Sequence, residues 1–265
     1  MIMGILNVTP DSFAERGPQL DPGAAIQAAL QMEFDGADLV DIGGESTRPG
    51  AAPLSKEEEL ARVLPIVRGL AGRLKIPMSI DTYKADVARA ALDAGACLVN
   101  DVSGLSREPE LGRVVAQYGA ALVLMHSRGT PATMIDHAVY EDVIADVVTE
   151  LSASVGTAVG AGVPVGQIVI DPGVGFAKRP AHSYGVLARL PEIAAALGRP
   201  LLVGASRKSF MREALADRPA VDRDWGTAAA VAASVLAGAH IARVHAVAEM
   251  AQVVRVAEEI RRHGQ

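Results

Sequence analysis

Aromatic residues are scarce in this chain: they occupy 3% of its 265 positions, and cysteine occurs only once. A core without aromatic bulk has to be built from Ala, Val, Leu and Ile, which suit buried parallel strands and the helices that cover them. The lone Cys97 cannot form an internal disulfide. Its apolar neighbours predict a small buried side chain rather than a reactive thiol.

An excess of basic residues is also missing, because 25 Lys and Arg face 31 Asp and Glu, for a formal net charge of −6. This balance, with few aromatic rings to stack on bases, excludes a protein that tracks nucleic acid. No apolar run approaches the ~18 residues of a membrane span. The sequence also opens in strand-like residues without a basic leader, so we expect a cytoplasmic protein with no membrane partner.

Eight short apolar runs recur along the chain, each followed by helix-like sequence. From Asn7 to His245 the mean spacing is about 34 residues, the length of a βα unit. The runs lack polar alternation, which indicates strands buried on both faces. We therefore predict a single (β/α)8 barrel domain spanning residues 1–265. The runs end at Asn7, Asp41, Asp81, Asn100–Asp101, His126, Asp171, Ser206 and Arg243–His245.

Local signals mark the helices and two long loops. Asp21-Pro22 predicts a helix start with proline in the first turn, and Ser55–Glu58 fits a capping box. Residues 8–19 and 43–53 are long and not periodic, and both follow predicted strands. Loops of this kind on the catalytic face of a barrel often close over substrate.

Asp81, Asn100 and Asp171 end strands three, four and six, so a barrel brings them to one mouth. Two carboxylates and a carboxamide can bind a flat heterocycle that presents amino and ring N–H donors beside a lactam carbonyl. The alternative for each residue is a helix-capping role. A divalent-metal cage is a further option, although no histidine pair has ligand spacing.

The segment Gly204–Ser209 follows strand seven and is predicted to enter a helix, so its cations and the helix N-terminus favour an anion. Arg243 and His245 leave strand eight, next to it, where many barrels bind phosphate. The alternative is a solvated surface cluster. Gly43–Gly50 alone is a weak anion-loop signal. We interpret His126, Trp225 and the methionines as structural, in cap or core positions.

Six segments in order resemble the bacterial dihydropteroate synthases, a family of pterin-binding enzymes, and the resemblance covers nearly the whole chain. It implies the condensation of 6-hydroxymethyl-7,8-dihydropterin diphosphate with 4-aminobenzoate, a requirement for Mg²⁺ and a homodimer. The matching segments are Met3–Phe13, Asp41–Gly50, Ser79–Thr82, Asn100–Gly104, Asp171–Phe176 and Ser206–Ser209.

The resemblance also implies a role for each matching residue. The pterin would be held by Asp81, Asn100 and Asp171 between walls of Val102, Met125 and Phe176, with Lys208 beside both rings. The diphosphate would contact Asn7, Thr47, Arg243 and His245, with Asn7 reaching the metal. Phe13 and Pro49 would enclose 4-aminobenzoate, Ser209 would receive its carboxylate, and Arg48 and Gly204 complete the substrate-binding set. Asp81, Asp171, Lys208 and Arg243 would be the catalytic residues.

Two other functions remain open on the sequence. One is a methyltransferase with a similar pterin-binding barrel, which would not need the Ser46–Gly50 loop or the Ser206–Ser209 segment. The other is a pterin-binding protein without catalysis. The chain also departs from the usual family pattern at Ala14 and Glu15 in the first long loop and at Ala246 after strand eight.

Overall fold

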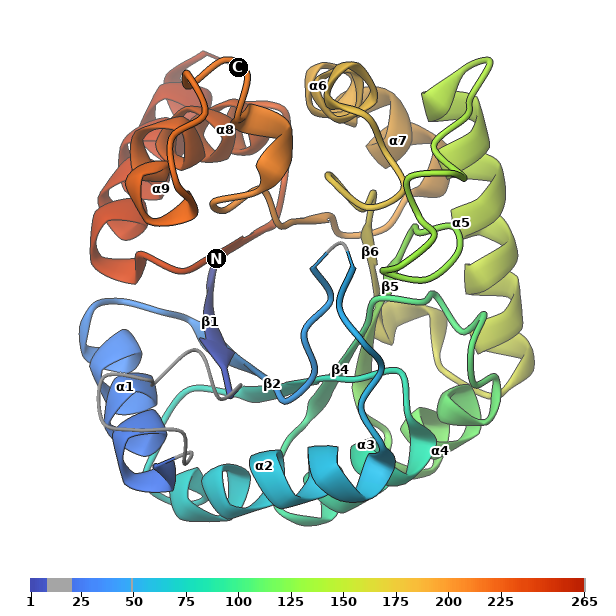
Figure 1. Ribbon diagram of the computed structural model, residues 1–265, viewed down its shortest axis with the longest axis vertical. Helices are drawn as coiled ribbons and strands as arrows, with labels where there is room; N and C mark the ends of the chain where they lie inside the picture. The colour runs from blue at the N-terminus through green and yellow to red at the C-terminus, as the bar shows by residue number, and fades with distance from the viewer. Residues whose placement is uncertain (9–20, 49, 265) are drawn as a thin grey trace.

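Eight parallel strands form one sheet in the order β6-β5-β4-β3-β2-β1-β8-β7 in the computed structural model, which describes residues 1–8, 21–48 and 50–264. A parallel bridge from Ile170 to Leu201 joins β6 to the segment that leads into β7, so the sheet closes. Figure 1 shows the helices as a ring around the strands. The predicted (β/α)8 barrel is thereby confirmed.

The elements alternate along the chain as predicted, except that β6 is followed by two short helices. The second of these starts at Leu190-Pro191, where proline lacks the N–H needed to continue the first. The strands are β1 (Ile2–Asn7), β2 (Leu39–Gly43), β3 (Met78–Asp81), β4 (Leu98–Asp101), β5 (Ala121–Met125), β6 (Ile168–Asp171), β7 (Leu202–Val203) and β8 (Ile241–Val244). The helices are α1 (Pro22–Phe34), α2 (Lys56–Leu70), α3 (Ala85–Asp93), α4 (Glu110–Tyr118), α5 (Val143–Gly160), α6 (Pro180–Ala188), α7 (Leu190–Leu197), α8 (Asp224–Leu236) and α9 (Val247–His263).

Both helix starts predicted from the sequence are confirmed. Asp21 accepts a hydrogen bond from the Gly23 N–H at 2.9 Å, and Pro22 occupies the first turn of α1. At α2 the capping box is complete: the Ser55 hydroxyl accepts from the Glu58 N–H at 3.2 Å, and the Glu58 carboxylate accepts from the Ser55 N–H at 3.1 Å. These caps satisfy backbone donors that the helices leave unpaired.

The strands have an apolar floor beneath a polar mouth. The floor consists of inward-facing Met3, Leu39, Leu98, Val123, Leu202 and Ile241, which pack together inside the barrel. Because side chains alternate along a strand, the residue two positions further on faces inward again. The side chains of Asp41, Asn100 and Arg243 therefore face into the mouth. They lie one layer above Leu39, Leu98 and Ile241, respectively. The parallel register also pairs Asp81 with Asn100 and Met125 with Asp171.

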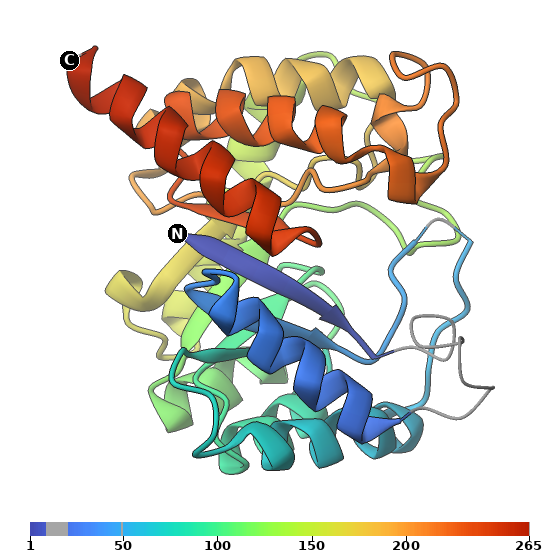
Figure 2. The ribbon, with the colours of Figure 1, turned by 90° about the vertical axis from the view of Figure 1, so that its left-hand side faces the viewer.

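Figure 2 shows the loop after β2 extending beyond the carboxyl ends of the strands, on the side to which β1 points. Its residues 44–48 and 50–55 therefore project from the face where the polar ends of the strands converge. This is the placement expected for the second long loop. Residues 9–19 of the first long loop lie outside the described residues.

Two expectations from composition are wrong. Cys97 is exposed, because it precedes the first residue of β4 at the lower rim rather than lying inside the strand. In addition, α5 has 18 residues with a mean hydropathy of 1.3, so it is long and apolar enough to cross a membrane by those two criteria. In the barrel its residues Ile144, Val147 and Leu151 are buried, and the helix packs against β5 and α7.

Candidate active site

Five inward-facing polar residues form a ring at the mouth of the barrel, which we call the polar ring: Asp41, Asp81, Asn100, Asp171 and Arg243. Arg243 links two of the carboxylates, since its Nε donates to Asp41 Oδ2 at 2.6 Å and its Nη2 to Asp81 Oδ2 at 2.7 Å. Burial raises the pKa of Asp81 to about 7, although the Arg243 charge acts in the opposite direction. The ring is therefore a buried, charged lining.

Asn100 and Asp171 each have one polar atom engaged by the protein. The Asn100 amide nitrogen donates to Asp41 Oδ2 at 2.8 Å, and Asp171 Oδ1 accepts from the Gly173 N–H at 2.8 Å. The Asn100 side-chain oxygen and the second Asp171 oxygen have no hydrogen-bond partner among the described residues. Both residues are at least 96% buried, and burial raises the pKa of Asp171 against the attraction of Lys208.

Lys208 reaches the ring from the segment after β7. Its ammonium donates to the Val174 carbonyl oxygen at 2.5 Å and lies 4.5 Å from the centre of the Phe176 ring. Burial lowers the pKa of Lys208 to about 8. Gly204 lies between the cations: a side chain built there would start 3.8 Å from both Lys208 Nζ and Arg243 Cβ.

A second polar group lies beside β1 and β8. His245 Nδ1 is 2.9 Å from the Ser206 hydroxyl oxygen, and its Nε2 is 3.5 Å from Asn7 Nδ2. Burial and then the charges of Arg243, Arg207 and Arg48 lower the pKa of His245 to about 3. The imidazole is therefore neutral at pH 7. The three guanidinium groups that disfavour an added proton would favour a bound anion.

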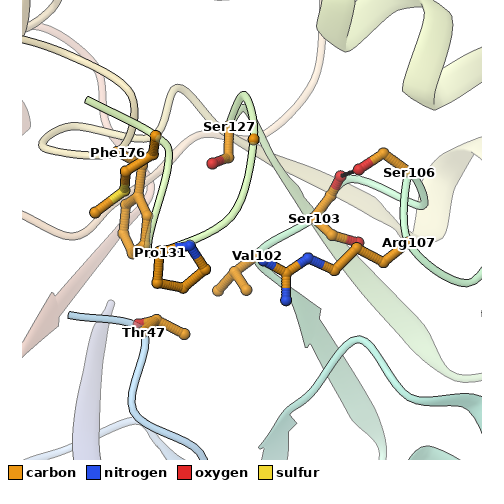
Figure 3. A pocket seen from close by; sticks show the side chains of 10 residues that line it. Thr47, Val102, Ser103, Ser106, Arg107, Ser127, Pro131 and Phe176 are labelled. Atoms are coloured by element: carbon orange, nitrogen blue, oxygen red, sulfur yellow. Dashed lines mark hydrogen bonds between the residues drawn. The ribbon is translucent and has the colours of Figure 1, made fainter. Parts of the chain in front are cut away.

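A small cavity opens where the loops after β2, β4, β5 and β6 meet (Figure 3). Thr47, Val102 and Phe176, three of the predicted substrate-binding residues, line it together. The rest of the lining is Ser103, Ser106, Arg107, Ser127, Gly129, Pro131 and Met134. Met125, also predicted as a wall, is buried at the end of β5 opposite Asp171.

The remaining predicted site residues lie on the two long loops and on the segment after β7. Phe13 and Pro49, together with Ala14 and Glu15, lie outside the described residues. Arg48 is exposed on the loop after β2. Ser209 begins only a three-residue 3-10 turn, Ser209–Met211, so the predicted helix N-terminus at this position is wrong. The long helix of this unit, α8, begins at Asp224 instead.

The interpretation of Trp225 as a structural residue in a cap or core position is wrong. The side chain is 89% exposed in the first turn of α8. His126 does have a structural environment: its Nδ1 is 2.8 Å from the buried Lys178 ammonium, and its Nε2 is 3.0 Å from Glu150 Oε2. The Asp101 carboxylate accepts hydrogen bonds from the N–H groups of Ser103 and Leu105. This is similar to the helix-capping role that was the alternative for the other polar residues at strand ends.

Asp41 and Ser206 were not among the predicted site residues, although both end predicted strands. Asp41 is fully buried and accepts from Arg243 and Asn100 through one oxygen, while its Oδ1 has no partner among the described residues. Ser206 contacts His245. The available signal was position: Asp41 stands two residues after the inward-facing Leu39.

Comparisons with known proteins identify the family of this chain. The family model of pterin binding enzymes matches residues 3–245. The dihydropteroate synthase of Synechocystis sp. is 48% identical over 259 residues, which cover 98% of this chain and 89% of that protein. The Escherichia coli dihydropteroate synthase is 42% identical over 257 residues, 97% of this chain and 90% of its own length.

Solved structures are similar over the same extent. The Yersinia pestis dihydropteroate synthase in complex with a sulfonamide drug has a TM-score of 0.93 at 41% identity, covering 99% of this chain and 94% of that one. The Xanthomonas albilineans enzyme in complex with 7,8-dihydropteroate has a TM-score of 0.88 at 37% identity, covering 98% and 92%.

The chain therefore belongs to the pterin-binding enzyme family. Within that family its function is that of the dihydropteroate synthases, transferases of folate biosynthesis, which confirms the activity predicted from the sequence motifs.

Proposed function

We propose that this protein joins 6-hydroxymethyl-7,8-dihydropterin diphosphate to 4-aminobenzoate at the barrel mouth, releasing 7,8-dihydropteroate and diphosphate. The observation that carries the proposal is the side-by-side placement of buried acceptors and cations. Asp81, Asn100 and Asp171 suit the N–H groups of a pterin, and the Arg243 cation and the neutral His245 imidazole would contact the diphosphate attached to it.

The pterin subsite uses the polar atoms that the protein leaves available. Asp171 presents one oxygen and Asn100 its amide oxygen, and Met125 and Phe176 supply apolar walls for the ring faces. A flat heterocycle enclosed in this way leaves no room for water at the carboxylates. Exclusion of water strengthens each polar contact with the ligand.

The diphosphate subsite combines Arg243 and His245 with Asn7, Thr47 and Arg48. Asn7 suits Mg²⁺, because its amide nitrogen faces His245 and its oxygen is the atom left for a hard cation. Among the described residues no three His, Cys, Asp or Glu side chains could hold a metal ion together. The remaining ligands would then be diphosphate oxygens and water. Bound Mg²⁺ would neutralise charge on the leaving group.

For 4-aminobenzoate we assign Lys208 and Phe176 to the ring and the exposed Ser209 to the carboxylate. Phe13 and Pro49, on the two long loops, remain predicted contacts of 4-aminobenzoate. Lys208 is suited to lie between the two substrates, because its ammonium already contacts the Phe176 face and the Val174 carbonyl. It would hold the aromatic ring next to the pterin methylene.

The chemistry then follows from the charges around the methylene carbon. The carbon–oxygen bond breaks with its electron pair passing to the diphosphate, whose growing charge is stabilised by Arg243. Ionised Asp81 and Asp171 stabilise the cationic pterin methylene that remains. The amine lone pair forms the new carbon–nitrogen bond, and the amine then loses a proton. No covalent enzyme intermediate is required.

We also propose a single domain over residues 1–265, a cytoplasmic location and a homodimer. One sheet contains every described strand, which supports the single domain. Trp225 at 89% and Val221 at 67% exposure lie together beside Arg218, Asp222 and Asp224, and we propose this mixed surface as the contact with a second copy. Analytical ultracentrifugation tests the dimer: the wild type should sediment as a dimer, and a Trp225→Ala monomer would place the interface at this surface.

The experiment for the reaction is product identification by mass spectrometry after mixing the purified protein, Mg²⁺ and the two substrates. Formation of 7,8-dihydropteroate is expected. A methyltransferase would form no dihydropteroate, and a pterin-binding protein without catalysis would bind the diphosphate substrate and leave it unchanged.

A further inference from the structure

A buried ion cluster lies at the start of the loop after β2, outside the polar ring. The Lys84 ammonium lies between Glu45 Oε2 and Glu59 Oε2, the latter at 2.5 Å. The three side chains are only 9%, 7% and 1% exposed, respectively. The Tyr83 hydroxyl donates to the second Glu45 oxygen at 3.2 Å. Neither Lys84 nor Glu45 has a role in the proposed reaction.

The cluster connects three elements. Glu45 belongs to the loop after β2, Glu59 to α2, and Lys84 is the residue immediately before α3. The loop start is held a second time, because Arg62 of α2 donates to the Gly44 carbonyl oxygen at 2.9 Å. A side chain at Gly44 would start 2.8 Å from Val63 Cγ1, so this part of the loop lies directly against α2.

The far side of the loop has its own contact, since the Gly50 N–H donates to the Pro131 carbonyl oxygen at 2.9 Å. Thr47 and Arg48 lie between this point and the ion cluster. Thr47 lines the cavity beside Phe176, and the Arg48 charge acts on His245. The position of Glu45 therefore determines where the chain enters the segment that contains Thr47 and Arg48, the two predicted substrate-binding residues of this loop.

The charges of the cluster allow a matched test. Two carboxylates share one ammonium, so the loss of either carboxylate leaves a neutral ion pair rather than an isolated buried charge. Burial disfavours the charged ammonium, but hydrogen bonds from Lys84 to Glu45 and Glu59 raise its pKa. When one of the two carboxylates is neutralised, the other still accepts a hydrogen bond from the ammonium.

We propose that Glu45 and Lys84 are positioning residues for the aromatic amine substrate: their ion pair fixes the start of the loop after β2 and thereby holds Thr47 and Arg48 at the mouth. This rests on the proposed function for the identity of the substrate. Glu59 of α2 holds Lys84 from the core side, and a side chain built at Gly44 would start 3.1 Å from Glu59 Cγ, so Glu59 lies against the loop before Thr47 and Arg48.

The test compares Glu45→Gln with Glu59→Gln. Each variant removes one negative charge next to the Lys84 ammonium. Glu45→Gln should raise the KM for 4-aminobenzoate about fivefold to tenfold while the Kd for 6-hydroxymethylpterin, measured by calorimetry, changes less than about twofold. Glu59→Gln should leave both constants near wild type even where it lowers the Tm. Lys84→Met should resemble Glu45→Gln, and Lys84→Arg should restore most of the wild-type KM.

Hydrogen exchange of the ligand-free protein provides a readout that needs no activity. Amides of residues 44–48 should exchange faster in Glu45→Gln and Lys84→Met than in the wild type, and at the wild-type rate in Glu59→Gln. Equal exchange in the two glutamine variants, or an equal rise in KM, would overturn the proposal. A wild type that forms no dihydropteroate would refute the proposed function, and the exchange rates would still decide the role of the ion pair.

Discussion

Asp81 and Arg243 form a buried ion pair across the barrel mouth, with Oδ2 and Nη2 2.7 Å apart on strands β3 and β8. The same guanidinium donates to Asp41, so one cation serves two carboxylates. Lysine has a single nitrogen and cannot reproduce this geometry. The pair therefore links the stability of the mouth to the subsite proposed for the diphosphate.

Arg243→Lys should weaken pyrophosphate binding about tenfold or more and lower the free energy of unfolding by about 1–3 kcal/mol, because one buried carboxylate loses its donor. Calorimetry and urea denaturation measure the two effects. Arg189→Lys is the matched control, since Arg189 binds Glu192 in an exposed pair. That variant should unfold at the same urea concentration as the wild type, because exposed ion pairs contribute little to stability. Equal effects of the two changes would contradict the role given to Arg243.

Asp171→Asn should weaken binding of a pterin ligand. The amide oxygen of Asn would accept from the Gly173 N–H, as Asp171 Oδ1 does, which turns the NH2 group towards the ligand donor. An unpaired buried donor costs about 1–3 kcal/mol, or about tenfold to a hundredfold in affinity. Calorimetry with 6-hydroxymethylpterin measures the change. Unchanged affinity in a folded variant would remove Asp171 from the site.

The pH dependence of kcat/KM should be bell-shaped with limbs near 7 and 8. Asp81, whose pKa burial raises to about 7, has to be ionised, so activity falls as the pH drops through this value. Lys208, whose pKa burial lowers to about 8, has to be charged, so activity also falls as the pH rises. Lys208→Arg should move only the alkaline limb upwards. An alkaline limb that stays in place would assign it to another group.

Binding of 4-aminobenzoate should depend on the other ligands, because we expect the two long loops predicted from the sequence to close over the bound diphosphate. The free protein should bind it poorly. Equilibrium dialysis with and without pyrophosphate, a pterin and Mg²⁺ tests this order. The same affinity in both conditions would be inconsistent with a pocket formed by loop closure.

Ala246→Asp should stabilise the fold. Ala246 is the N-cap of α9 and provides no side-chain acceptor, and it is one of the positions at which the sequence departs from the pattern of the family that it resembles. An Asp or Ser cap contributes about 1 kcal/mol by accepting from a backbone N–H of the first turn. Thermal unfolding of Ala246→Asp and Ala246→Ser should give higher Tm values than wild type. A lower Tm for both would mean that the backbone at residue 246 cannot place a capping side chain.

The sequence predicted the barrel and the convergence of Asp81, Asn100 and Asp171 because strand ends in this fold share one face. It did not predict the connection between Asp41 and Arg243, which depends on the closure of β1 against β8. The segment after Lys208 has helix-like residues but forms only a 3-10 turn, with α8 starting later. Cys97 and Trp225 were misplaced because local hydrophobicity does not show that Cys97 lies just before β4 or that Trp225 lies on the uncovered face of α8.

Diphosphate release from the purified enzyme, measured with 6-hydroxymethyl-7,8-dihydropterin diphosphate and Mg²⁺ before and after addition of 4-aminobenzoate, tests the central claim most directly. The account predicts that release depends on 4-aminobenzoate and matches dihydropteroate formation one for one. It also predicts that release falls strongly in Asp171→Asn. Tight binding of the pterin diphosphate without any release on addition of 4-aminobenzoate would contradict it.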